Sequence, residues 1–128
     1  MTHKVLIADD EPNIVISLEF LMKREGHDVS VARDGQQALD AIRSLRPDLV
    51  LLDVMMPYKT GYEVLQELRA DEAIAHTKVL MLTAKGRDTD TAKGLALGAD
   101  AYMTKPFSTK ELAERVRQML AAGQPAKP

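Results

Sequence analysis

Hydrophobic residues follow two patterns that alternate along the chain. Short unbroken apolar runs are typical of strands that are buried on both faces of a sheet. Five such runs occur, at Val5–Ala8, Val29–Ala32, Leu49–Leu52, Val79–Leu82 and Ala101–Met103. Each run is followed by a stretch in which apolar residues return every three or four positions, which is the spacing of an amphipathic helix. The chain therefore predicts five repeats of a strand followed by a helix.

The predicted helices carry boundary signals of their own. Pro12 stands in the first turn of the first helix, and Gly26 follows its end. Ser108, three residues before Glu111, gives the capping-box pattern at the start of the last helix. The residues that mark the helices are Ile14, Val15, Leu18, Leu21 and Met22, then Ala38, Leu39, Ile42 and Leu45, then Val64, Leu65 and Leu68, then a weaker pattern over Thr89–Leu97, and finally Leu112, Val116, Met119 and Leu120.

Strands that alternate with helices predict a parallel sheet joined by right-handed crossovers, with helices on both faces. We expect an α/β fold with a five-stranded parallel sheet in the order 2-1-3-4-5 and five helices. This is the flavodoxin-like three-layer sandwich. Residues 3–121 are expected to form one domain, and residues 122–128 a flexible tail or the start of a linker.

Composition and charge narrow the possible functions. The 128 residues suffice for one domain, and the absence of cysteine excludes disulfides, thiolate metal sites and cysteine nucleophiles. The 17 Lys and Arg balance 19 Asp and Glu without a basic block, which gives little support for direct binding of nucleic acid. No apolar stretch is long enough for a signal peptide or a membrane span, so we expect a cytoplasmic protein with no membrane contact.

Chemically active side chains stand where the predicted strands end. Asp9 and Asp10 follow the first strand, Asp53 follows the third, Thr83 the fourth and Lys105 the fifth. The carboxyl ends of parallel strands meet at one edge of the sheet, where ligands bind in such folds. Because the first and third strands are neighbours in the expected order, three carboxylates should converge there.

Carboxylates brought this close repel one another, and crowding raises their pKa. A divalent cation with oxygen ligands such as Mg²⁺ would relieve the repulsion. A carboxylate can also act as a nucleophile toward a phosphoryl group. Asp53 suits that role because the stiff loop after it, "VMMP", fixes its direction and turns backbone carbonyls toward the metal. Lys105 would then neutralise phosphoryl charge, and Thr83 would donate a hydrogen bond.

Each of these residues also has an ordinary structural interpretation. Asp9 and Asp10 could simply favour the start of a helix, and Thr83 could be a plain strand residue. Their joint placement at matching strand ends favours the functional interpretation. His3, His27 and His76 are isolated in the sequence, and we expect them to be surface residues without a role as ligands.

Four motifs together resemble the receiver domain of two-component response regulators, of the single-domain chemotaxis-regulator type. They are "IADDEP" at 7–12, "LLDVMMP" at 51–57 with Gly61, "LTA" at 82–84 and "YMTKPF" at 102–107. The resemblance covers essentially the whole chain. It implies a Mg²⁺-dependent domain that receives a phosphoryl group on Asp53 from a phosphohistidine of a kinase or phosphotransfer protein.

The resemblance also assigns roles to the surrounding residues. It implies that Asp10, Asp53 and the backbone carbonyl of Met55 hold the metal directly, and that Asp9 does so through water. Lys105 becomes the clamp on the phosphoryl group, with a cis bond to the following proline.

Two further residues match the switch of the family. Thr83 is the switch hydroxyl and Tyr102 is the aromatic side chain that follows it. The expected output is the binding of a downstream protein by the face formed by the fourth helix, fifth strand and fifth helix. The domain would then be a signalling switch and no enzyme, apart from assisting its own phosphorylation and dephosphorylation. Such a domain is expected to be a monomer or a weak dimer through the same face.

Two departures from the family pattern stand out. Thr60 replaces the more common Asp or Asn before the glycine, but threonine is still a helix-capping residue. Ala101 stands where the winged-helix subgroup carries an acid that pairs across a dimer.

Other functions remain open from the residues alone. A haloacid-dehalogenase-like Mg²⁺ phosphatase also uses an Asp at a strand end, but it needs a second Asp where this chain has Met55. A flavodoxin-type cofactor protein would need a phosphate-binding loop rich in Ser, Thr and Gly after the first strand, where this chain has "DDEPN". A receiver-like domain that binds no metal is the third alternative.

Overall fold

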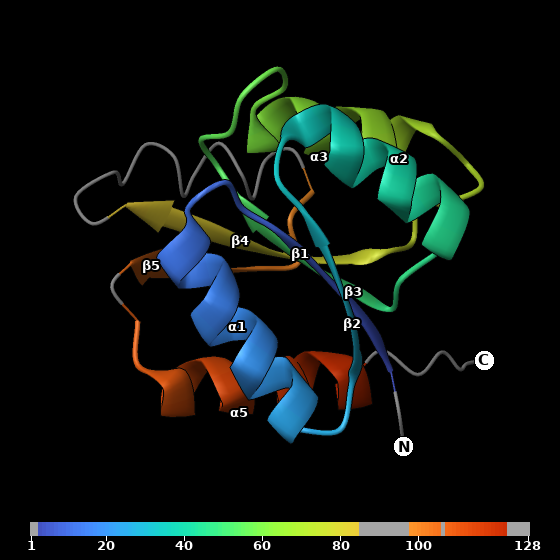
Figure 1. Ribbon diagram of the computed structural model, residues 1–128. Coiled ribbons are helices and arrows are strands. Elements are labelled where there is room, and N and C mark those ends of the chain that lie inside the picture. Colours follow the sequence, from blue (N-terminus) through green and yellow to red (C-terminus); the bar gives the residue numbers. More distant parts are fainter. Residues whose placement is uncertain (1–2, 85–97, 106, 123–128) are drawn as a thin grey trace.

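The computed structural model describes residues 3–84, 98–105 and 107–122. Five parallel strands form one sheet in the order β2-β1-β3-β4-β5, as the sequence predicts (Figure 1). Each strand agrees with its predicted range to within two residues at either end. The strands are β1 Lys4–Ala8, β2 Asp28–Ala32, β3 Leu49–Asp53, β4 Lys78–Ala84 and β5 Ala101–Lys105.

Helices cover both faces of this sheet, with α1 and α5 on one side and α2 and α3 on the other (Figure 1). In the described ranges these four helices are α1 Pro12–Arg24, α2 Gly35–Leu45, α3 Gly61–Ala70 and α5 Thr109–Ala122. The fourth predicted helix, over Thr89–Leu97, lies outside the described residues, as do residues 123–128 of the expected tail. The three-layer α/β fold is thus confirmed.

The core is divided by the sheet because neighbouring residues of a strand point to opposite faces. Leu6, Leu52 and Met81 pack with α2 and α3 in one cluster. Ile7 and Leu51, each one position away in its strand, pack with α1 and α5 in the other cluster. All five positions of β3 are buried, as expected of the central strand of a sheet that is covered on both sides.

Local capping sets where the helices begin. Pro12 occupies the first turn of α1. The Ser108 hydroxyl accepts a hydrogen bond from the Glu111 backbone N–H at 3.0 Å, as one half of the expected capping box requires. A complete capping box opens α3, where Thr60 and Glu63 each accept the other's backbone N–H. Thr60 therefore keeps the helix start despite departing from the family pattern.

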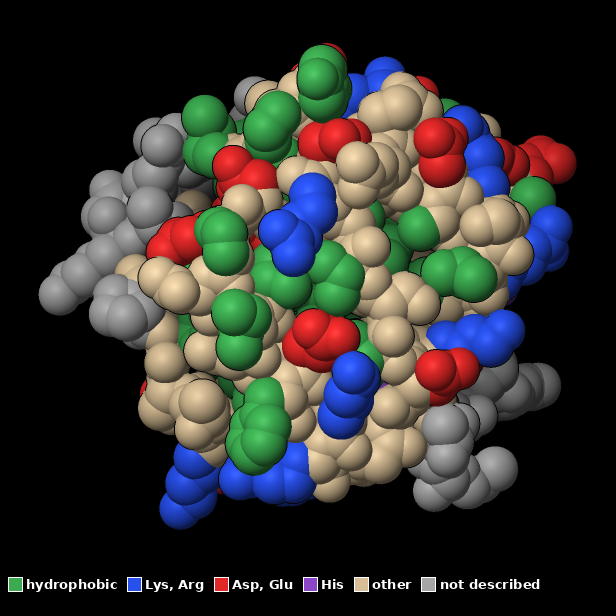
Figure 2. Space-filling model, viewed as in Figure 1, with side chains coloured by type: hydrophobic (Ala, Val, Ile, Leu, Met, Phe, Trp, Pro, Cys, Tyr) green, Lys and Arg blue, Asp and Glu red, His purple; other side chains and the backbone are tan. Residues whose placement is uncertain are grey.

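One outer side of α1 is less polar than the amphipathic pattern predicts. Hydrophobic side chains are visible along this helix in the space-filling view (Figure 2), and Ile16 and Phe20 are 64% and 67% exposed. The Arg24 guanidinium lies 5.8 Å from the centre of the Phe20 ring and covers part of it. Across the described ranges of the chain, no helix combines the length and the apolar character that crossing a membrane requires.

The prediction that all three histidines are isolated surface residues is wrong for two of them. His3 and His27 are half-buried, and their rings meet edge to face with centres 5.8 Å apart. The cause is the pairing of β1 with β2, since the Asp28 N–H donates to the His3 carbonyl at 2.8 Å. His76 is exposed, as expected.

Candidate functional site

Three carboxylates meet at the carboxyl edge of the sheet. β1 pairs with β3 in a register that places Ala8 opposite Leu52, so the residues that follow these two positions lie at the same level. Asp9, Asp10 and Asp53 each bring a carboxylate oxygen within 4.8 Å of the others. Asp9 is fully buried, Asp53 is nearly so and Asp10 is exposed. The cluster therefore has a closed side and an open side.

Lys105 reaches the same cluster from the end of β5. Its Nζ atom lies 3.0 Å from Asp9 Oδ2 and 3.3 Å from Asp53 Oδ1. Burial alone would lower the pKa of this ammonium, but the hydrogen bond to Asp9 and the charge of Asp53 outweigh burial and raise it. Lys105 is therefore a fixed positive charge between two of the three acids.

The electrostatic state of Asp53 differs from that of an ordinary carboxylate. Burial and the neighbouring charge of Asp9 raise its pKa to about 6, although Lys105 and a hydrogen bond from the Met55 backbone act in the opposite direction. This pKa lies below 7, so the carboxyl group of Asp53 is mainly ionised at neutral pH. The side chain is thus both desolvated and available as a nucleophile.

Thr83 and Tyr102 lie on one face of the sheet, on neighbouring strands. The register pairs Tyr102 with Met81, and Thr83 follows Met81 by two positions, so all three point to the same side. Thr83 is 2% exposed, and its hydroxyl has no hydrogen-bond partner within the described part of the chain. A buried hydroxyl without a partner is energetically unfavourable, so it is suited to donate to a ligand oxygen.

The loop between β3 and α3 holds Asp53 in place. The Gly61 N–H donates to the Val54 carbonyl at 2.8 Å, which closes the loop on itself. A Cβ atom at Gly61 would lie only 2.3 Å from the Asp53 carbonyl oxygen, so glycine is required there. The Met55 backbone lies beside the Asp53 carboxylate, while its side chain is 56% exposed. Its carbonyl as a metal ligand remains a prediction.

Sequence reasoning missed Gly35, which contacts this loop from α2. The signal was present, because glycine is a poor helix former and here it occupies the first helical position after Asp34. The Asp34 side chain already caps α2 by accepting the Gln37 N–H at 2.8 Å, so the cap does not explain the glycine. The cis bond expected before Pro106 lies outside the described residues.

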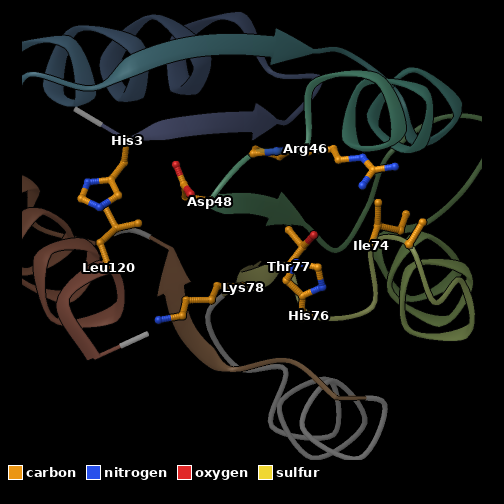
Figure 3. Close-up of a pocket in the computed structure, with 10 residues that line it drawn as sticks. His3, Arg46, Asp48, Ile74, His76, Thr77, Lys78 and Leu120 are labelled. Carbon is orange, nitrogen blue, oxygen red and sulfur yellow. The ribbon is translucent and has the colours of Figure 1, made fainter. Parts of the chain in front are cut away.

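A cavity of about 320 Å³ lies at the opposite edge of the sheet and has no part in the acidic site. It is lined where β1, β3 and β4 begin, with His3, Arg46, Asp48 and Lys78 among its residues (Figure 3). The Lys78 ammonium donates to the Met119 carbonyl near the end of α5. The charge of Lys78 thus stabilises the negative end of α5.

The acidic site fits a divalent metal ion. Three carboxylates against one ammonium leave two negative charges in a largely buried cluster. Mg²⁺ would supply the balancing charge, and it prefers carboxylate and carbonyl oxygens together with water. Asp10 is exposed, so solvent reaches the cluster on that side.

Comparison with known proteins assigns the family. Residues 5–117 match the model of the response regulator receiver domain. The chain is 44% identical over its whole length to the alkaline phosphatase synthesis transcriptional regulatory protein PhoP of Bacillus subtilis (strain 168), covering 52% of that protein. It is 47% identical over 94% of its length to the DNA-binding response regulator MtrA of Mycolicibacterium smegmatis, covering 51% of that protein. The chain thus spans about half the length of these relatives.

Solved structures agree with this assignment. The receiver domain of the Francisella response regulator 1452 superimposes with a TM-score of 0.87 at 36% identity, over 95% of this chain and 99% of that one. The chemotaxis response regulator CheY4 of Vibrio cholerae gives 0.87 at 30% identity, over 93% and 99%. Receiver domains are phosphorylation-activated switches of two-component signalling that bind Mg²⁺ at an acidic cluster, and response regulators interact with histidine kinases and downstream effectors. This chain belongs to the response regulator receiver domain family.

Proposed function

We propose that this domain receives a phosphoryl group on Asp53, in the presence of Mg²⁺, from a phosphohistidine of a histidine kinase or phosphotransfer protein. The observation that carries the proposal is the convergence of three carboxylates within 4.8 Å, two of which share Lys105. A cluster that served only to start α1 would need neither Asp53 nor Lys105.

The reaction is a transfer between two nucleophiles. An ionised oxygen of Asp53 attacks the phosphorus and the phosphorus–nitrogen bond to the donor imidazole breaks. The leaving nitrogen keeps the electron pair of that bond and takes up a proton from water. The Met55 backbone and Lys105 orient the carboxylate for this attack. Bound by Asp9, Asp10, Asp53 and the Met55 carbonyl, Mg²⁺ would neutralise the charge on the phosphoryl oxygens.

Thr83 would sense the modification. Its buried hydroxyl has no partner in the described part of the chain, so a new phosphoryl oxygen beside it offers a hydrogen bond that exists only after transfer. Contacts of that kind shift an existing equilibrium between two conformations. Tyr102 lies on the same face of the sheet, and its side chain would move with Thr83. That movement would alter the surface formed by the fourth helix, β5 and α5, to which a downstream protein would bind.

That surface is also where self-association would occur as a weak dimer. Part of its charge is already paired within the chain, since Arg117 binds Glu25 and Asp100 binds Arg69. The name of MtrA includes DNA binding, but this chain matches only half of that protein. We assign no direct contact with nucleic acid to the receiver domain itself.

The alternative of a haloacid-dehalogenase-like phosphatase has no support in the site. Such an enzyme needs an acid two residues after the nucleophile to protonate the leaving group, and Met55 carries none. We therefore place the domain among switches that help to phosphorylate and dephosphorylate themselves.

The test is incubation with Mg²⁺ and acetyl phosphate, followed by intact-protein mass spectrometry. We expect the gain of one phosphoryl group by the unmodified protein and no gain by Asp53→Asn. Asp40→Asn is the matched control, since Asp40 is an exposed carboxylate on α2 and should leave the uptake unchanged. Absence of uptake by the unmodified protein, or uptake by Asp53→Asn, would refute the proposal.

A further inference from the structure

The loop from Val54 to Thr60 has a strained tip. Tyr58 has a positive φ of 68°, and the Lys59 N–H donates to the Pro57 carbonyl at 2.8 Å across it, which makes a γ-turn. A γ-turn whose central residue has a positive φ is rare when that residue is not glycine, and it is energetically unfavourable. Tyr58 is 86% exposed, so its own side-chain packing does not explain why the turn persists. Contacts of the neighbouring backbone must hold it.

Gly35, the first residue of α2, makes those contacts. Its N–H donates to the Pro57 carbonyl at 3.2 Å, so one oxygen accepts both from the turn and from α2. The Lys59 backbone also presses against the glycine. A Cβ atom at position 35 would lie 2.2 Å from the Lys59 carbonyl oxygen and 2.4 Å from its Cβ. Real Cβ atoms essentially never approach another atom within 3.0 Å, so a side chain here would force α2 and the loop apart by at least 0.8 Å.

The other end of the loop is anchored directly at Asp53. A Cβ atom at Gly61 would meet the Asp53 carbonyl, and the Gly61 N–H binds Val54. The loop is thus held between two glycines at the starts of α2 and α3. If the tip is displaced, the residues between the tip and Asp53 must move with it, and these residues include Met55.

We propose that Gly35 is a positioning residue for the metal site. Its contact with the loop after Asp53 keeps that loop in the geometry that binds the metal. The inference rests on the proposed function of Asp53. Mg²⁺ requires near-ideal octahedral ligands at about 2.0–2.1 Å, so a shift approaching 1 Å in the loop that supplies a ligand weakens binding. Gly35 touches neither the metal nor the acids and acts only through the loop.

The first test compares Gly35→Ala with Gly26→Ala. Gly26 has a φ of +89° and open space around its α-carbon, so alanine there strains the backbone without touching the loop. Both variants should be less stable than the unmodified protein. Isothermal titration with Mg²⁺, at a temperature where circular dichroism shows each variant folded, should give about tenfold weaker binding for Gly35→Ala and unchanged binding for Gly26→Ala. Equal affinities in the two variants would overturn the proposal.

The second test needs no variant and therefore does not depend on Gly35→Ala folding. If the protein binds Mg²⁺ only while the contact between Gly35 and the loop is closed, bound Mg²⁺ reduces the population of the open form, from which the Gly35 amide exchanges. Mg²⁺ at ten times its Kd should then slow hydrogen exchange of that amide about tenfold. The Gly26 amide, bonded to the Lys23 carbonyl at 2.9 Å, should be unaffected. An unchanged Gly35 rate, or equal slowing of both amides, would refute the inference. Failure of the unmodified protein to bind Mg²⁺ would instead refute the proposed function.

Discussion

Asp53 shows how the environment of a single residue prepares its chemistry. Crowding by neighbouring carboxylates can be expected from the sequence, and it predicts a raised pKa. The structure adds that burial is the larger cause, ahead of the charge of Asp9. Lys105 limits the rise, because it stabilises the ionised form through its contact at 3.3 Å. The resulting pKa of about 6 keeps a desolvated carboxylate ionised at neutral pH.

The opposing effects of these two neighbours can be separated in the metal-free protein. Lys105→Met removes the positive neighbour, so it should raise the pKa of Asp53 above 6. Asp9→Asn removes the negative neighbour and leaves Lys105 to Asp53 alone, so it should lower that pKa. Carboxyl ¹³C chemical shifts followed through a pH titration in the presence of EDTA measure both changes. Lys110→Met, at an exposed position on α5, is the control and should leave the value unchanged. Shifts of the same sign in both variants would contradict this account.

At the scale of elements, Arg69 ties two connections of the sheet to α3. Its guanidinium donates to the carbonyls of Ala75 and Thr77, which lie just before β4. It also donates to the Gly98 carbonyl and to the Asp100 carboxylate, just before β5. One planar side chain thus donates to three backbone carbonyls and a carboxylate. The starts of β4 and β5 are held together by this network.

Arg69→Ala should therefore lower the free energy of unfolding by about 2 kcal/mol, since it removes the charged donor that binds three partly buried carbonyls. Urea unfolding provides the measurement. The matched control is Arg43→Ala, which removes an exposed pair with Asp71 at 3.4 Å and should change stability by less than about 1 kcal/mol. Equal losses in the two variants would show that the network contributes no more than a surface ion pair.

At the scale of the whole molecule, the contact between His3 and His27 links stability to pH. Burial is the main reason that the pKa of His27 is lowered, and the charge of His3 lowers it further, while Glu25 and Asp48 act in the opposite direction. The pKa of His27 in the unfolded chain is about 6.5, which is higher than in the folded protein. As the pH falls below that value, the unfolded chain therefore takes up a proton at His27 before the folded protein does. His27 thus contributes stability above that pH, and the contribution is lost as the pH falls toward the folded pKa.

The comparison of His27→Gln with the unmodified protein at pH 7.5 and pH 5.5 isolates this contribution. Asp53 acts in the opposite sense, because its raised pKa favours the folded state as the pH falls through about 6, but it is common to both proteins. We expect the urea midpoint at pH 5.5, taken relative to that at pH 7.5, to be higher in His27→Gln than in the unmodified protein. His76→Gln, at an exposed position, should respond to acid as the unmodified protein does. A response of His27→Gln identical to that of the unmodified protein would exclude the effect.

Much of this architecture was predictable because it depends on local periodicity. The apolar runs give the strands, the three- and four-residue spacing gives the helices, and parallel strands align their carboxyl ends at one edge. For that reason the sequence alone predicts that Asp9, Asp10, Asp53 and Lys105 meet, as they do in the structure. The capping role of Thr60 followed from its residue type alone.

Tertiary structure alone decided the contacts between residues whose positions in the sequence are unrelated. Nothing in the local pattern places Gly35 against the backbone of Lys59, His3 against His27, or Arg69 against Gly98. Each depends on the distance and angle at which packed elements approach, and these are set by the sum of all core contacts. The order of residues along each strand fixes which side chains stand at the carboxyl edge of the sheet, because parallel strands all end there. How tightly the loop after Asp53 is held depends instead on packing between α2 and that loop.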